Sequence, residues 1–214
     1  MCTVLPGDFN REKMKHGNGV YTWMEPDEES GEAKKVASYV GKYADGKKTG
    51  FGKMTFPNGD VYFGEWKDNK VLIGLCFFDA LPCHLNSIVC CLQIEGEGTY
   101  TYVKTKDVYS GSWVAGVKSG NGCYEYGGDK SKLNGTWGNG SFISGEWVME
   151  GAAVFKGSFV NGAPSGAGSF TFASGVSQEG EYVVKPVSED EDPTDAPPAP
   201  PTWAGSNVFS TVVS

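Results

Sequence analysis

The stretch YSGSWVAGVKSGNGCYEY at residues 109–126 contains the two short phrases that decide the fold of this chain. The first phrase, from Tyr109 to Trp113, has the pattern aromatic-x-Gly-x-aromatic. The second, from Gly120 to Tyr126, is Gly-x-Gly followed by aromatic residues at every second position, which indicates a β-strand with one buried face. Turn-forming residues separate the phrases, such as Asn161-Gly162 in another copy, because glycine accepts a positive φ angle. Each copy therefore predicts one β-hairpin.

The first phrase occurs six times, starting at residues 39, 62, 109, 133, 155 and 178, and the weaker copies at 133 and 178 begin with Leu and Gln instead of an aromatic residue. The steps are 23, 47, 24, 22 and 23 residues, and a period of this length indicates a repeat array. Trp66 and Trp113 are expected to lie between neighbouring hairpins. The predicted structural core of the repeats consists of aromatic and glycine positions of this phrase: Tyr39, Gly41, Tyr43, Tyr62, Gly64, Trp66, Tyr109, Gly111, Trp113, Trp137, Phe155, Gly157, Phe159 and Tyr182.

The second phrase begins at Gly17, Gly50, Gly96, Gly120 and Gly166. A single hairpin is only marginally stable in water, so the hairpins are expected to stack and share a core. We therefore predict an all-β protein, an elongated antiparallel sheet of stacked hairpins with almost no helix. None of these copies extends to Gly-x-Gly-x-x-Gly and each precedes a strand pattern, so they do not support a nucleotide-binding loop.

Together the two phrases resemble the MORN repeat family (membrane occupation and recognition nexus) over residues 16–184. Residues 155–182, the acidic run that follows and the proline and tryptophan around Trp203 are similar to the family of radial spoke head protein 1. This resemblance implies a structural role in the head of the ciliary radial spoke. Its implied partners are other spoke-head proteins and a second MORN protein copy. Two segments depart from the family pattern: residues 133–154, where Ser144 stands at the start of the expected Gly-x-Gly, and residues 71–95.

The sequence divides into an N-terminal extension at 1–15, a repeat array at 16–184 and an acidic, proline-rich tail at 185–214. The tail is expected to be disordered, because proline-rich and acidic segments cannot form a packed core. Within the array, a charged loop is expected at 24–38. Trp203 and Phe209 follow the proline-rich spacer and are either inert or anchors for a partner.

The apolar, cysteine-rich insert at 71–95 interrupts an otherwise regular repeat. A transmembrane helix would have to bury Asp79, Pro82, His84 and Asn86. The remaining interpretations are a docking loop for a partner, a retained intron or gene-model error, and a metal site. The metal site would use Cys76, Cys83, His84, Cys90 and Cys91, whose spacing differs from that of common zinc sites. Removing the insert joins residues 67–70 to Gly96 and restores a normal repeat, but the sequence does not choose among these alternatives.

The formal net charge is −8, and five of the acids lie in the tail. An acidic chain is repelled by nucleic-acid phosphates and by anionic membranes, so no nucleic-acid partner is expected. The lysines are dispersed among acids, Lys42, Lys47, Lys48 and Lys53 among them, which favours a solvated sheet face over a lipid-binding patch. No secretory signal is recognisable at the N-terminus, so the six cysteines are expected to be reduced thiols in the cytosol.

Neither His16 nor His84 is joined to a convincing Ser or Cys nucleophile motif, and the chain shows no familiar metal or phosphate signature, so no catalytic residue, cofactor or metal is predicted. We expect a non-enzymatic scaffold of the ciliary or flagellar axoneme, a component of the radial spoke head that mediates protein–protein contacts for motility. The alternative is a peripheral, phospholipid-binding MORN protein that tethers membrane to cytoskeleton.

Overall fold

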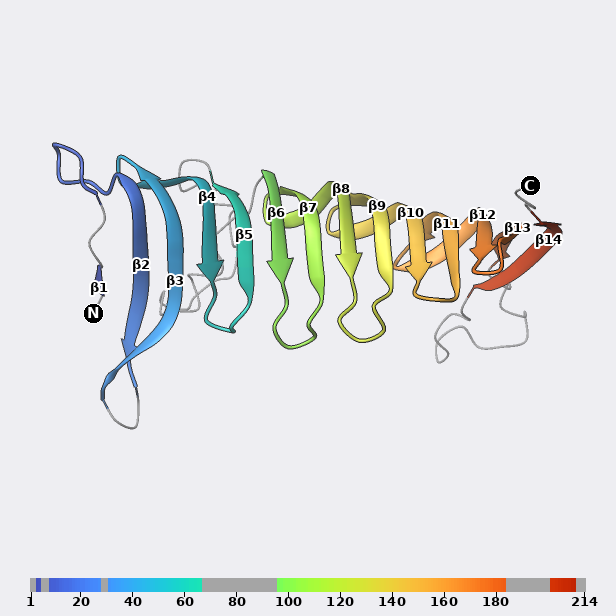
Figure 1. Ribbon diagram of the computed structural model, residues 1–214, viewed down its shortest axis with the longest axis horizontal. Helices are drawn as coiled ribbons and strands as arrows, with labels where there is room; N and C mark the ends of the chain where they lie inside the picture. Colours follow the sequence, from blue (N-terminus) through green and yellow to red (C-terminus); the bar gives the residue numbers. More distant parts are fainter. Residues whose placement is uncertain (1–2, 5–7, 28–30, 67–95, 184–200, 211–214) are drawn as a thin grey trace, which may run out of the picture.

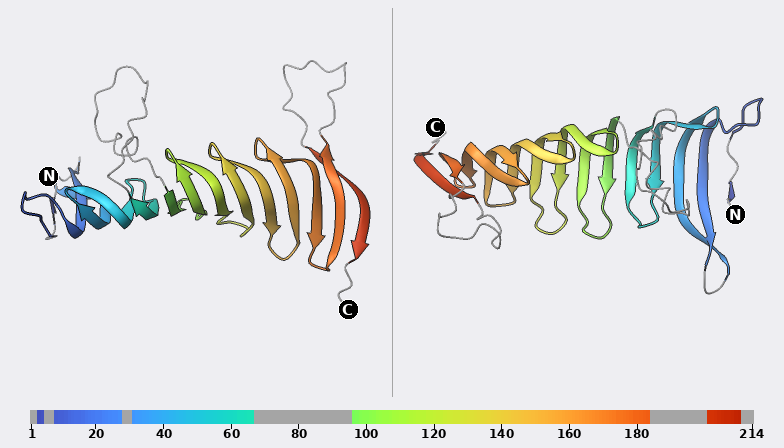
Figure 2. Two further views of the ribbon diagram at one scale, coloured as in Figure 1. Left: turned by 90° about the horizontal axis from the view of Figure 1, so that it is seen from above. Right: turned by 180° about the vertical axis from the view of Figure 1, so that it is seen from behind.

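The computed structural model describes residues 3–4, 8–27, 31–66, 96–183 and 201–210. All regular elements in these residues are β-strands, and they form one antiparallel sheet in which each strand lies beside its neighbours in the chain, from β1 to β14. The sheet is long, open and twisted, with β2 and β14 near opposite ends (Figures 1 and 2). This confirms the predicted all-β array of successive hairpins.

The strands follow the repeat phrases closely. Their bounds are β1 (Thr3–Val4), β2 (Gly17–Pro26), β3 (Ala33–Ala44), β4 (Lys47–Thr55), β5 (Val61–Trp66), β6 (Gly96–Thr101), β7 (Val108–Val114), β8 (Val117–Glu125), β9 (Lys132–Gly138), β10 (Ser141–Met149), β11 (Ala153–Val160), β12 (Ala163–Phe172), β13 (Val176–Val183) and β14 (Thr202–Ser210). Aromatic-x-Gly-x-aromatic phrases fall on β3, β5, β7 and β11, and the Gly-x-Gly phrases fall on the strands that pair with them.

A continuous row of glycines crosses the sheet and fixes its register. The pairs link Gly19, Gly41, Gly52, Gly64, Gly98, Gly111, Gly122, Gly135, Gly145, Gly157, Gly168, Gly180 and Gly205 in that order. The row leaves a side-chain-free channel over which rings can lie flat. A Cβ added at Gly52 would stand only 2.6 Å from Cζ of Tyr39. Glycine is therefore required there for close approach rather than for backbone freedom.

One face of the sheet carries the core, a nearly continuous series of aromatic rings. Tyr39, Tyr62, Tyr109 and Phe155 are at most 1 % exposed. The ring of Trp113 lies 6.5 Å from that of Tyr62 on β5 and 4.9 Å from that of Tyr109 on its own strand, measured between centroids. Tryptophan therefore lies between neighbouring hairpins, as the sequence predicted.

The charged segment at 24–38 differs from the prediction of a loop. β2 continues to Pro26 and β3 begins at Ala33, so most of the segment lengthens the first hairpin. Glu25 pairs with Lys34 across the two strands. The backbone ladder of the first hairpin therefore continues into the charged stretch that was expected to be a loop.

The sheet passes without interruption from β5 to β6. Tyr62 pairs with Tyr100 and Gly64 with Gly98, so the flanks of the insert come together in the expected register. The insert at 71–95 itself, with every interpretation offered for it, lies outside the described residues.

The tail prediction needs a correction at its C-terminal part. Residues 202–210 form β14, which pairs with β13, for example Trp203 with Tyr182. Residues 185–200 of the tail lie outside the described part of the chain. At the other end, Thr3–Val4 of the predicted N-terminal extension pair with β2, and Phe9 forms a bridge with Lys15.

Candidate binding groove

The predicted core residues serve the fold. Their glycines, Gly41, Gly64, Gly111 and Gly157, all belong to the glycine row. The side chains of Tyr39, Tyr43, Tyr62, Trp66, Tyr109, Trp113, Trp137, Phe155 and Phe159 are buried, and Tyr182 packs partly buried against them. These residues hold the hairpins together, and Trp137 and Phe159 among them also line surface hollows.

Indole hydrogen bonds join three of the hairpins to the hairpin before them. The indole N–H of Trp66 donates to the carbonyl of Gly52 at 3.0 Å. Trp113 and Trp137 repeat this bond, to the carbonyls of Gly98 at 3.2 Å and Gly122 at 3.1 Å. A buried indole thus has its donor satisfied by the glycine row.

Aspartates in the turns provide a second connection between hairpins. Asp60, in the β4–β5 turn, accepts hydrogen bonds from the hydroxyl of Tyr100 at 3.0 Å and from the backbone N–H of Val103 at 2.8 Å. Asp107, in the β6–β7 turn, accepts corresponding bonds from Tyr124 and from the N–H of Gly127, both at 2.7 Å. Burial alone would raise the pKa of Asp107, but the bonds from Gly127 and Tyr124 outweigh it and lower the pKa. Each aspartate therefore fastens its own turn to the next turn along the same long edge (Figure 1).

Lys48 and Lys118 lie inside the aromatic face, although the sequence suggested a solvated face for Lys48. Lys48 Nζ is 5.1 Å from the ring centroids of both Tyr39 and Trp66. Lys118 Nζ is 4.2 Å from the ring of Tyr124 and 4.8 Å from that of Trp137. Burial lowers the pKa of Lys48 to about 8 and also lowers that of Lys118. Aromatic faces attract the ammonium group and partly offset its lost hydration.

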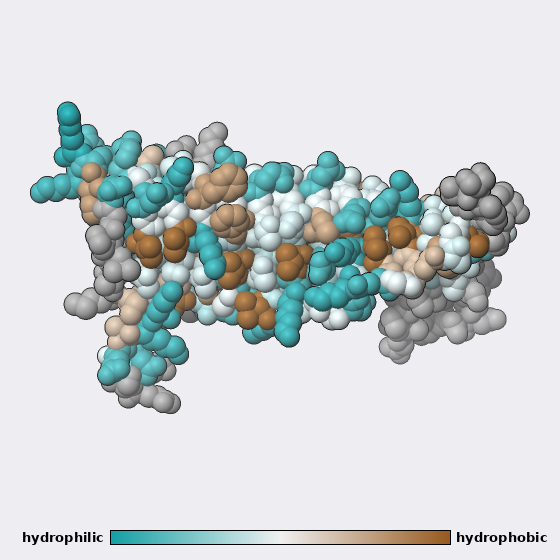
Figure 3. Space-filling model, in the orientation of Figure 1, coloured by the Kyte–Doolittle hydropathy of each residue, from teal (hydrophilic) through white to brown (hydrophobic). Residues whose placement is uncertain are grey.

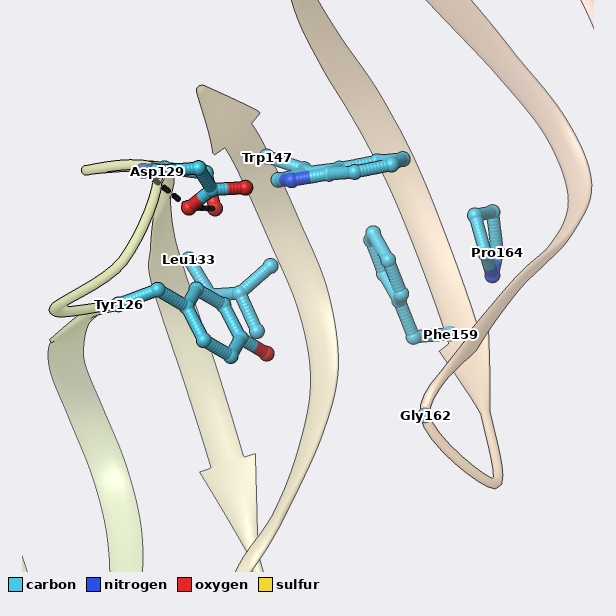
Figure 4. A pocket seen from close by; sticks show the side chains of 8 residues that line it. Tyr126, Asp129, Leu133, Trp147, Phe159, Gly162 and Pro164 are labelled. Carbon is cyan, nitrogen blue, oxygen red and sulfur yellow. Dashed lines mark hydrogen bonds between the residues drawn. The ribbon is translucent and has the colours of Figure 1, made fainter. Parts of the chain in front are cut away.

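A cavity of about 230 Å³ opens on the aromatic face between the β8–β9 turn and the β11–β12 hairpin. Its lining is Tyr126, Asp129, Ser131, Leu133, Trp147, Phe159, Gly162 and Pro164 (Figure 4). A second hollow of about 410 Å³ shares Tyr126, Leu133, Phe159 and Gly162 with it and extends to Lys118 and Trp137. We call the two hollows together the aromatic groove.

Asp129 places a negative charge at the rim of this groove. Its Oδ1 accepts hydrogen bonds from the backbone N–H of Ser131 at 3.0 Å and from the Ser131 hydroxyl at 2.8 Å. These bonds lower the pKa of Asp129, so the carboxylate is ionised at neutral pH. The carboxylate lies at the same end of the cavity as the indole nitrogen of Trp147 (Figure 4).

The groove coincides with the segment that the sequence identified only as a degenerate repeat. Ser144 does not interrupt the glycine row, because Gly145 pairs with Gly135 and Gly157 in its place. A register shift between Phe142 and Ser144 accommodates the change. The sequence analysis therefore missed the site. The signal for it was that this repeat has neither a lysine at the position of Lys118 nor an aspartate at the position of Asp107.

Trp203 is not an exposed anchor for a partner. Its ring lies 4.9 Å from that of Phe170 and 5.1 Å from that of Tyr182, between centroids. Its indole N–H donates to Oε1 of Gln178 at 3.2 Å. The residue instead covers the C-terminal end of the core. Phe209 lies on β14 opposite Ser177.

Within the described residues, no three His, Cys, Asp or Glu side chains gather in a way that could hold a metal ion. His16 lies at the surface, with Nδ1 3.4 Å from Oδ1 of Asp45. The described part of the chain also contains no helix of the length and apolarity needed to cross a membrane.

These features define a β-hairpin repeat protein whose units are joined by aromatic stacking, indole bonds and turn aspartates. The family model of the MORN repeat matches the chain at residues 7–24, 39–61, 93–104, 109–128 and 155–177. The chain therefore contains MORN repeats, and residues 129–154, which include much of the groove lining, lie between the last two matches. No curated protein is significantly similar in sequence to the chain.

Proposed function

We propose that the protein is a non-enzymatic scaffold of the ciliary or flagellar axoneme, a component of the radial spoke head that mediates protein–protein contacts for motility. The observation that carries this proposal is the similarity of residues 155–182 and the segment around Trp203 to radial spoke head protein 1. The MORN repeats are also consistent with a non-enzymatic repeat scaffold.

The construction of the sheet suits a mechanical scaffold. Consecutive hairpins are joined by indole bonds such as that of Trp113 and by turn-to-turn bonds such as those of Asp107. In a repeat array each unit contacts only its neighbours, so bonds between neighbouring units hold the array in shape. Such an array can transmit contact along its length, which a spoke head requires.

Proteins are the partners that the exposed surfaces favour. We call the sheet face opposite the aromatic core the outer face. On it Phe51 is 63 % exposed and Phe63 is 53 % exposed, and their rings stack with centroids 6.2 Å apart. On the face in Figure 3, hydrophobic residues are scattered among hydrophilic ones. The open sheet edge at β14 is a further place for another chain to add a strand. The proposed partners are other spoke-head proteins and a second MORN copy.

The proposal is tested by fractionating cilia that carry the tagged full-length protein. The expected result is that the protein stays with the axonemes after a non-ionic detergent removes the membrane, and that its loss disturbs beating while the doublets still assemble. Quantitative release into the detergent fraction would overturn the proposal.

A parallel experiment addresses the lipid-tether alternative. Purified protein is sedimented with vesicles of phosphatidylcholine, with and without phosphatidylserine. The net charge of −8 opposes binding to the anionic vesicles, so the protein is expected to stay in the supernatant in both cases. Cosedimentation with the anionic vesicles alone would favour the membrane function.

A further inference from the structure

The lysines of the aromatic face occupy one fixed position of the repeat. Lys15, Lys48 and Lys118 each stand two residues before the first glycine of a Gly-x-Gly phrase. Their Nζ atoms lie over aromatic rings of the same face, at 3.8 Å from Tyr21 for Lys15 and 4.2 Å from Tyr124 for Lys118. In three hairpins the chain thus places its own ammonium group among the rings.

The hairpin of β9 and β10 lacks this lysine, as does the hairpin of β11 and β12, where Pro164 stands at the same position. From Trp137 to Gly145 there are 145 − 137 = 8 steps, whereas from Trp113 to Gly122 there are 122 − 113 = 9. Phe142 stands where the lysine would be, and its ring packs against Trp137 and Phe159 at 5.1 and 4.8 Å. The shorter connection therefore replaces a cation with a ring that turns toward Trp137.

The walls of the 230 Å³ cavity are the counterparts of the rings around Lys118. By position in the repeat, Tyr126 corresponds to Tyr102, Leu133 to Tyr109, Trp147 to Tyr124 and Phe159 to Trp137. Figure 4 shows Tyr126, Trp147 and Phe159 standing around the cavity. The cavity is thus the same aromatic cage one repeat further along, without a lysine of its own repeat.

The charge around the two cages also corresponds. The negative charge of Asp107 favours the charged form of Lys118. In the next repeat Ser131 stands at the position of Asp107, and Asp129, two residues earlier, supplies the carboxylate. A cage of aromatic faces with an ionised carboxylate at its rim attracts a cation.

We propose that the cage of Tyr126, Leu133, Trp147 and Phe159 binds the side chain of a lysine from a partner polypeptide, with Asp129 pairing with its ammonium group. The occupant follows from the chain itself, because Lys48 and Lys118 fill the equivalent cages of other repeats. The partner contributes to this repeat the ammonium group that three other repeats supply internally, through Lys15, Lys48 and Lys118. The proposal of this site does not depend on the proposed location in the radial spoke head. A partner lysine bound here fixes the position of the partner along the repeat array.

The test uses the full-length, ¹⁵N-labelled protein and two short probe peptides. One is acetyl-Gly-Ser-Lys-Ser-Gly-amide, and the other has norleucine in place of lysine, which keeps the apolar stem and removes the charge. The indole N–H signal of Trp147, assigned from the spectrum of the Trp147→Phe protein, is followed by NMR titration. The lysine peptide is expected to shift this signal saturably and to bind at least fivefold more tightly than the norleucine peptide.

Variants distinguish the cage from general charge attraction. Asp129→Asn keeps an oxygen that can accept the bonds from Ser131 and should weaken lysine-peptide binding at least fivefold. Glu146→Gln removes an acid that pairs with Lys156 on the outer face, 3.5 Å away, and should leave binding unchanged. Thermal unfolding of each variant checks that it is folded.

The possible results decide the proposal directly. Equal binding of both peptides, or binding of neither to the folded wild-type protein at millimolar concentration, would overturn it. Equal weakening by Asp129→Asn and Glu146→Gln would show non-specific charge attraction and would overturn it too. An arginine peptide that binds while the lysine peptide does not would refute the choice of lysine.

Discussion

At the scale of single residues, the fold depends on rings lying over glycines. Tyr39 covers the glycine row at Gly41 and Gly52, and its hydroxyl donates to the carbonyl of Lys42 at 3.3 Å. Tyr109 forms the corresponding bond with the carbonyl of Ser112 at 3.1 Å. The ring stays close to the backbone because no side chain of the row separates them, while its polar end remains satisfied.

A methyl group on the glycine row should therefore be costly. Gly52→Ala places Cβ against the Tyr39 ring and is expected to lower the free energy of unfolding by about 2–3 kcal/mol. Gly128→Ala is the matched control, because an added Cβ there meets nothing within 4 Å. Urea unfolding measures both, and equal stability of the two variants would contradict the packing described.

Tryptophan truncation tests the joint between hairpins. Trp66→Ala removes a ring buried to 9 % exposure and the bond to Gly52, so we expect a loss of about 3–5 kcal/mol and a clearly lower melting temperature. Phe63→Ala, on the outer face of the same strand, should change stability far less. A wild-type melting temperature for Trp66→Ala would mean that the ring contributes nothing to the joint.

At the scale of elements, the turns are joined along one edge of the sheet. Asp107→Ala removes two hydrogen bonds and leaves the hydroxyl of Tyr124 and the N–H of Gly127 without this partner. We expect a loss of about 2–3 kcal/mol. Amide hydrogen exchange should increase at residues 124–131 more than elsewhere. Lys104→Ala, in the same turn, is the control, and unchanged exchange in the Asp107 variant would argue against this connection.

The direct pairing of β5 with β6 leads to a prediction about the insert. Deleting residues 71–95 leaves Lys67 to Lys70 to connect two strands that already pair through Gly64 and Gly98. The shortened protein is expected to fold with equal or higher stability. Circular dichroism and thermal unfolding measure this, and loss of soluble protein would show that the segment is needed for folding.

At the scale of the whole molecule, the buried tyrosines set an upper pH limit. Burial raises the pKa of Tyr43, Tyr62 and Tyr109 to about 12, whereas in the unfolded chain it is about 10. Between these values the unfolded chain has lost protons that the folded protein keeps, so stability falls as the pH rises from about 10 to about 12.

Lys48 changes the stability of the fold in the opposite direction, and it does so at lower pH. Its pKa of about 8 lies below that of an unfolded lysine, so stability rises between about pH 8 and 10. One lysine cannot offset several tyrosines, and cooperative unfolding is expected above pH 10. Ultraviolet absorbance of tyrosinate, followed together with circular dichroism, should show ionisation and unfolding in one step. Ionisation at pH 10 with the fold intact would contradict the burial.

The sequence by itself determined the repeat period, the all-β architecture and the buried aromatic positions. It could do so because hairpin turns, strand alternation and the ring-over-glycine pattern are properties of residues close together in the chain. Three features were decided only by the tertiary structure: the addition of β14 with Trp203 against the core, the enclosure of Lys48 and Lys118, and the cavity beside Asp129. Each depends on which side chains of separate hairpins meet. A one-residue difference between repeats, as at Phe142, changes which side chains are in contact, while the strand pattern stays the same.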